Sequence, residues 1–168
     1  DELKKIKGIS VFEPQENTPG CEKYDITKIT LNFKAFGLSG YDMERILRNK
    51  YKIQVELADL YNIILLVSLA DNQETLKYLV NCCREIASKR TQQNIVKYAP
   101  AWPAIPPVAV TPRDAMYRSE IKTVALKDAV GEISAEMIMA YPPGIPLVCP
   151  GEYITQETVD YVQVLKSE

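Results

Sequence analysis

A proline-rich segment at residues 140–152, which reads AYPPGIPLVCPGE, has the composition of a rigid wall beside a binding site. Each proline fixes its backbone φ angle and lacks an N–H donor, so neither a helix nor a central strand is expected there. Its apolar side chains are unsuited to a free loop, and we expect them to press against protein or line a cavity: Tyr141, Ile145, Leu147 and Val148. A purely structural crossover, whose prolines only lower the entropy of the unfolded chain, explains the same residues and remains open.

Two charged residues, one at the end of this segment and one well before it in the sequence, have roles that the sequence leaves undecided. Glu152 follows a Pro-Gly pair, where a carboxylate makes a turn or helix-start contact as readily as it transfers a proton. Arg113 suits a carboxylate or phosphate partner, and an ion pair at the surface is the favoured interpretation.

The residue types that the sequence lacks exclude several kinds of site. There is no histidine, so Ser-His and Cys-His nucleophile pairs and the commonest metal ligand are absent. The four cysteines, among them the adjacent Cys82 and Cys83, show no C-x-x-C spacing, which argues against a zinc site or a disulfide framework. We therefore expect neither a self-contained hydrolase nor a metal site.

Composition and charge indicate an ordinary globular protein. The 168 residues are 46% hydrophobic and 25% charged, with a net charge of −2 and no long run of either sign, so binding to nucleic acid or an anionic membrane is not expected. The longest apolar run, residues 63–70, is too short to span a bilayer, and the start, DELKKIKG, lacks the apolar core of a signal peptide. These features predict a soluble, cytoplasmic chain.

Residues 1–99 have the pattern of an α+β layer, a small antiparallel sheet covered on one face by helices. Residues 1–8 are typical of the tail of a helix, an abrupt beginning that leads us to expect a preceding segment. Strands are predicted at residues 9–12, at 28–36 and 53–57 from hydrophobic alternation, and at 63–69 from a continuous apolar run, the last two forming a hairpin. Apolar spacing and caps predict helices from Ser39 to about Asn49, and from Asp71 through Ala87.

The composition changes at Pro100, which we take as the boundary between domains at 1–99 and 100–168. The segment PAWPAIPPVAVTP is expected to be an extended crossover held by its own apolar side chains. A short helix is predicted from Thr111 to about Arg118, a helical turn at 126–130, a strand at 133–139 and a final helix at 155–165.

The segments AVGEISAEMIM at 129–139 and AYPPGIPLVCPGEYIT at 140–155 resemble the carboxy-terminal signature of the bacterial ornithine/lysine/arginine decarboxylases. Further matches in the same order and spacing are FGLSGYDMERIL at 36–47, IQVELADLYNIILLVSL at 53–69 and VTPRDAMY at 110–117. The resemblance covers nearly the whole chain. It implies that residues 1–99 end an aminotransferase-like small domain and that residues 100–168 form a compact α+β C-terminal domain.

The resemblance also implies a cofactor and binding residues. These enzymes hold pyridoxal phosphate on the lysine of a Ser-x-His-Lys motif, which a chain without histidine cannot contain, so the cofactor-binding half is expected to be missing. The family's substrate-binding glutamate matches Glu56, whose carboxylate would hold the distal cation of a basic amino acid; an exposed strand glutamate is the alternative. Signature positions expected near the active-site entrance or subunit interface are Tyr141, Pro142, Gly144 and Glu152. Glu132 departs from the family's usual arginine, which places the contacts of that residue in doubt.

Two functions follow from these features. The first is the C-terminal portion of a pyridoxal phosphate-dependent decarboxylase in polyamine metabolism, inactive in isolation, with arginine favoured over lysine or ornithine. Its expected partners are its own large domain and further copies in a homo-oligomer. The second is a non-catalytic regulatory or assembly module related to these enzymes.

Overall fold

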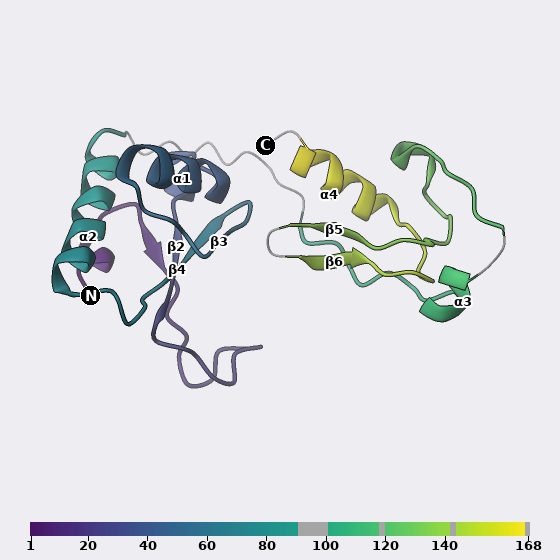
Figure 1. Ribbon diagram of the computed structural model, residues 1–168, viewed down its shortest axis with the longest axis horizontal. Coiled ribbons are helices and arrows are strands. Elements are labelled where there is room, and N and C mark those ends of the chain that lie inside the picture. Colours follow the sequence, from purple (N-terminus) through teal and green to yellow (C-terminus); the bar gives the residue numbers. More distant parts are fainter. Residues whose placement is uncertain (91–100, 118–119, 142–143, 167–168) are drawn as a thin grey trace. The chain divides into compact units, whose positions relative to one another are not determined.

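The computed structural model describes residues 1–90, 101–117, 120–141 and 144–166 (Figure 1). The chain divides into two compact units, Asp1–Lys97 and Tyr98–Glu168, each described by itself below. The domain boundary predicted between residues 99 and 100 lies outside the described residues. No helix in these four ranges is long and apolar enough to cross a membrane.

The first unit is an α+β layer, as predicted, built on a four-stranded antiparallel sheet in the order β1-β2-β4-β3. The central strands pair so that Leu31 lies opposite Ile63 and Ile29 opposite Leu65. These residues form one core with the apolar stripe of the longer helix, so the helices cover that face of the sheet. The elements are η1 (Leu3–Lys5), β1 (Ser10–Val11), β2 (Lys28–Asn32), η2 (Lys34–Phe36), α1 (Gly40–Ile46), η3 (Leu47–Tyr51), β3 (Leu57–Ala58), β4 (Asn62–Leu66) and α2 (Gln73–Ser88).

Helix α1 begins at the predicted capping box. The Ser39 hydroxyl accepts a hydrogen bond from the Asp42 N–H, and the Asp42 carboxylate accepts one from the Ser39 N–H. Gly40 lets this helix start against the β3–β4 turn, because a Cβ at Gly40 would lie 2.2 Å from the carbonyl oxygen of Asn62. The helix continues as a single π turn, η3, which ends at Lys52 with a positive φ.

Several boundaries in this unit differ from the predicted ones. The strand predicted for 28–36 ends at Asn32, whose carboxamide oxygen accepts from the Lys34 N–H and opens a 3₁₀ turn that leaves Ala35 exposed and buries Phe36. Residues 1–8 form only the 3₁₀ turn η1, and β4 ends at Leu66. Helix α2 is capped by Asn72 rather than Asp71, because the Asp71 carboxylate is already bonded to Ser68.

In the second unit, one helix, a two-stranded sheet and irregular segments pack around a small core. That core consists of Ala129, Val148, Ile154 and Val159, with Leu126 and Ile138 packed against it. The elements are α3 (Pro112–Tyr117), η4 (Leu126–Asp128), β5 (Ile138–Ala140), β6 (Ile145–Val148) and α4 (Gln156–Lys166). The predicted helices at 111–118 and 155–165 and the turn at 126–130 are therefore present, although residue 118 lies outside the described ranges.

Residues 151–154 join the rest of this unit through backbone hydrogen bonds. The Gly151 carbonyl accepts from the N–H groups of Ala109 and Val110, at 2.8 and 3.1 Å. The Gly151 N–H donates to Ser134, and the Ile154 N–H donates to Glu132. The segment therefore lies between residues 107–110 on one side and 131–134 on the other.

A strand passes through Pro146 in the proline-rich segment, which agrees with the expectation of no central strand there, because both strands of this two-stranded sheet are edges. One strand prediction for the second unit is wrong in its bounds. The strand predicted for 133–139 is confined to Ile138–Ala140, with only an isolated bridge at Ile133. The crossover, described from residue 101, is held in part by its own apolar side chains, since the Trp102 ring meets Tyr161 of α4 edge to face while Ile105 is exposed. The Ala104 N–H adds a polar contact to Glu157 of the same helix.

Candidate functional site

Glu56 lies at a bend in the first unit, directly before β3. The bend breaks the alternation predicted over 53–57. Val55 and Ala58, three positions apart, are both buried, whereas an alternating strand would bury every second residue, and only Leu57–Ala58 pairs as a strand. The Glu56 N–H donates to the Ile64 carbonyl at 2.8 Å, which fixes the backbone, while the side chain is exposed. Its carboxylate makes no hydrogen bond or ion pair within the described residues, so it is available to a cationic ligand.

The signature residues of the second unit occupy two different places. Tyr141 and Gly144 belong to the turn that joins β5 to β6, where Gly144 has a φ of +83° and its N–H donates to Ala140. The Tyr141 side chain is 86% exposed. Pro142 lies outside the described residues, and Glu152 follows the other end of β6, so the hairpin does not bring Glu152 to Tyr141 and Gly144.

Glu152 has a structural partner in its own turn. One carboxylate oxygen accepts a hydrogen bond from the Cys149 N–H at 2.7 Å, and the Glu152 N–H donates back to the Cys149 carbonyl at 3.2 Å. The turn contact that the sequence left open is therefore present. Of the four apolar residues expected to pack here, Leu147 and Val148 are buried, whereas Tyr141 and Ile145 are exposed.

Glu132, in place of the family's usual arginine, forms an ion pair of its own. Its carboxylate accepts from the Lys122 ammonium at 2.7 Å, and both side chains are largely exposed. A pair of this kind contributes little stability, about 0–1 kcal/mol.

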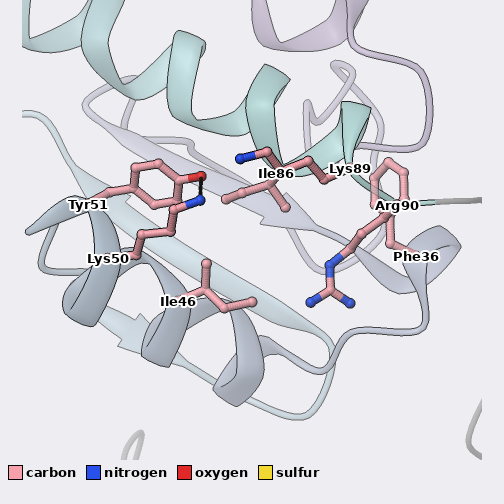
Figure 2. Close-up of a pocket in the computed structure, with 7 residues that line it drawn as sticks. All are labelled: Phe36, Ile46, Lys50, Tyr51, Ile86, Lys89 and Arg90. Carbon is pink, nitrogen blue, oxygen red and sulfur yellow. Dashed lines mark hydrogen bonds between the residues drawn. The ribbon is translucent and has the colours of Figure 1, made fainter.

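A pocket that the sequence did not predict lies between the end of α2 and the helix formed by α1 and η3. It has a volume of about 530 Å³. Figure 2 shows Ile46, Lys50 and Tyr51 on one side and Ile86 and Lys89 on the other. We call it the cationic pocket, and its lining residues are Phe36, Ile46, Lys50, Tyr51, Ile86, Lys89 and Arg90. The lining comes from segments up to about fifty residues apart, so the sequence does not show that they meet. Basic residues near the ends of two helices, Lys50 and Lys52 and then Lys89 and Arg90, are the signal that the sequence offers.

Glu85 holds two of the cations of this pocket. Lys50 donates to one Glu85 carboxylate oxygen and to the Tyr51 hydroxyl, each at 2.9 Å, and Lys89 donates to the same carboxylate oxygen. The bonds from Lys89 and Lys50 lower the pKa of Glu85 to about 2. The pKa of Lys50 is raised, first by its bond to Tyr51 and then by Glu85, so the side chain is an ammonium ion.

We expect the ion pairs of Glu85 to stabilise the first unit above the ordinary carboxyl pKa of about 4.3, and to lose this effect as the pH falls towards 2. The folded-state pKa is the lower one, so acid favours the unfolded state over this range. Urea midpoints of the chain and of Glu85→Gln should therefore differ at pH 7, and the difference should be much smaller at pH 2. The difference at pH 7 should shrink in 1 M salt, because the groups are exposed. An equal difference between the two urea midpoints at both pH values would contradict a stabilising role for the ionised Glu85 carboxylate.

Known proteins resemble this chain over nearly all of its length. Residues 89–168 match the family described as "Orn/Lys/Arg decarboxylase, C-terminal domain". The arginine decarboxylase of Bacillus subtilis is 40% identical over 165 residues, which are 96% of this chain and 34% of that protein. The arginine decarboxylase of Halalkalibacterium halodurans is 43% identical over 167 residues, 97% of this chain and again 34% of the relative. The chain thus spans about a third of the length of these relatives.

A more distant relative has a solved structure. The constitutive lysine decarboxylase of Escherichia coli is 41% identical over 73 residues, 40% of this chain and 10% of that protein. Its structure superposes with a TM-score of 0.64 and 21% identity, covering 94% of this chain and 30% of that one. At this identity the superposition shows that the α+β fold is shared.

Proposed function

Because this chain belongs to the Orn/Lys/Arg decarboxylase family, with the family's C-terminal domain at residues 89–168, we propose that it is the C-terminal portion of a pyridoxal phosphate-dependent enzyme that converts a basic amino acid to its amine and CO₂. The observation that carries this proposal is the 40–43% identity to arginine decarboxylases over nearly the whole chain. We place the enzyme in the cytoplasm, in polyamine metabolism, as a homo-oligomer.

Arginine is the favoured substrate, with lysine and ornithine as the alternatives. The arginine decarboxylases align over 96–97% of the chain, whereas the Escherichia coli lysine decarboxylase aligns over 40% at similar identity. The first unit, which carries Glu56, is therefore covered more fully by the arginine enzymes.

The residues of this chain do not fit the attachment of pyridoxal phosphate. The sequence has no histidine and hence no Ser-x-His-Lys motif. A Schiff base forms from a neutral amine, whereas Lys50 is held as an ammonium ion by Tyr51 and Glu85, and Lys89 is paired with the same Glu85. When bound, this cofactor supplies the electron sink for decarboxylation. We assign its attachment to a part of the protein outside this sequence.

The contribution of this chain to catalysis is substrate binding by Glu56. The guanidinium or ammonium group at the end of a basic side chain needs a carboxylate that is not already neutralised. Glu56 meets this requirement within the described residues. The hydrogen bond from its N–H to the Ile64 carbonyl fixes the backbone from which the side chain extends. The carboxylate holds and orients the substrate's distal cation and takes no part in proton transfer.

The turn between β5 and β6 is the part of the signature that we assign to the active-site entrance or to a subunit interface. The exposed Tyr141 ring supports this assignment, because an aromatic side chain open to solvent in the isolated chain is free to pack in the whole protein. Gly144 shapes the turn and Pro142 belongs to the same segment. Glu152 supports the segment from its far end through the bond to Cys149.

Release of CO₂ from carboxyl-labelled arginine, lysine and ornithine tests the proposal on the whole protein with pyridoxal phosphate. We expect the highest kcat/KM with arginine and no release by the 168-residue chain alone. Higher kcat/KM with lysine or ornithine would overturn the substrate assignment only. No release from any of the three by the whole protein would favour a non-catalytic regulatory or assembly module. Release by the isolated chain would overturn the assignment of cofactor attachment to a part of the protein outside this sequence.

A further inference from the structure

The cationic pocket carries more positive charge than its own carboxylate neutralises. Lys50, Lys89 and Arg90 line it, and Glu85 is the acidic group paired with two of them. The guanidinium of Arg90 makes no hydrogen bond or ion pair within the described residues, and Figure 2 shows it apart from Lys50 and Lys89, beside Phe36. The pocket therefore has an excess of two positive charges. The planar Arg90 guanidinium also offers several N–H donors, so the pocket is suited to an anion with several oxygen atoms.

The same pocket offers an apolar surface beside these charges. Ile46 projects from α1 and Ile86 from α2 into the space between the two helices (Figure 2). Ile46 is partly exposed, whereas Ile86 and Phe36 are both buried in the core, with Phe36 at the end nearest Arg90. A free inorganic anion would leave this surface in water, so a ligand with an organic group attached to the anion uses the pocket better.

We propose that the cationic pocket binds a phosphate monoester with a small apolar or aromatic organic group. The dianion matches the excess of two positive charges, with Arg90 making the bidentate contact and the two lysines acting as point charges. The organic group packs on Ile46, the partly exposed apolar side chain of the lining. A volume of about 530 Å³ holds a ligand of this size. The lining residues described here all belong to the first unit of this chain and do not include Glu56, so the proposal does not rest on the proposed decarboxylase activity.

Titration calorimetry of the 168-residue chain with phenyl phosphate at low ionic strength tests the site. Arg90→Gln should weaken binding about tenfold, because it removes a charge-assisted pair. Lys77→Gln is the matched control, since Lys77 is an exposed cation of α2 outside the pocket lining, and it should change Kd less than twofold. No measurable heat with the unsubstituted chain, or equal effects of the two variants, would overturn the proposal.

Glu85→Gln provides a test in the opposite direction. It removes the carboxylate that competes for Lys50 and Lys89, so phenyl phosphate should bind about threefold to tenfold more tightly, which damage to the fold would not produce. Inorganic phosphate and benzoate, which lack the organic group and the second charge respectively, should each bind more weakly than phenyl phosphate. Equal affinity for either one would overturn the ligand class.

Discussion

Replacing Gly151 by alanine is expected to lower the free energy of unfolding of the second unit by about 3 kcal/mol. Gly151 has a φ of +91°, and a Cβ there would lie 2.3 Å from the carbonyl oxygen of Val110. That oxygen belongs to the backbone, which is held in place because the Ala109 and Val110 N–H groups both donate to Gly151. Urea denaturation followed by tyrosine and tryptophan fluorescence measures the change, since Trp102 contacts Tyr161 in this unit.

Gly131→Ala is the control that separates the two causes of this loss. Gly131 has a similar φ of +83°, but a Cβ there would meet nothing within 4 Å. Only the cost of a left-handed backbone remains, about 1 kcal/mol. Equal losses for the two variants would show that the close approach of Gly151 to Val110 is not a cause of the instability.

The second large effect rests on the proposed function and concerns Glu56. In the whole protein, Glu56→Gln should reduce kcat/KM for arginine about 30-fold, mainly through a higher KM, because the substrate cation loses its charged partner. Glu16→Gln is the control, since Glu16 is an exposed glutamate of the loop between β1 and β2. Steady-state CO₂ release with each variant measures both parameters.

A substrate without a distal charge separates binding of the cation from a general loss of activity. For norleucine, whose side chain ends in no cation, Glu56→Gln should leave kcat/KM unchanged or raise it, because no distal charge is present to hold. Equal loss for arginine and norleucine would contradict the role of Glu56 and point to a structural one.

The sequence predicted those features of the fold that depend on neighbouring residues. The capping box of Ser39 and Asp42, the hairpin of β3 and β4 and the helix started by Thr111 all follow from side chains within a few residues of each other. The sequence did not predict where strands end. Asn32 stops β2 by bonding to the Lys34 N–H, and Glu56 lies at a bend, because local polar contacts and burial outweigh an alternating pattern.

Of the two candidate sites, one was found from the sequence and the other was not. Glu56 was found through a resemblance, and the structure adds that its backbone is fixed and its carboxylate free among the described residues. The cationic pocket was not found, because Phe36, Lys50 and Arg90 come together only when α1 and α2 pack on the same face of the sheet. Apolar periodicity predicts each helix separately and gives no information about which polar residues meet beside them.

The backbone connections of residues 151–154 also determine when the second unit can fold. The bridges from Val108 to Glu152 and from Ile133 to Tyr153 join residues about 44 and about 20 positions apart, so neither partner segment can complete its hydrogen bonds before residues 151–154 leave the ribosome. The first unit has its sheet and both helices complete by Ser88. During synthesis, we therefore expect the elements of the first unit to form while the second unit is incomplete, and a stall before residue 151 to leave Val148 without the core residues Ile154 and Val159.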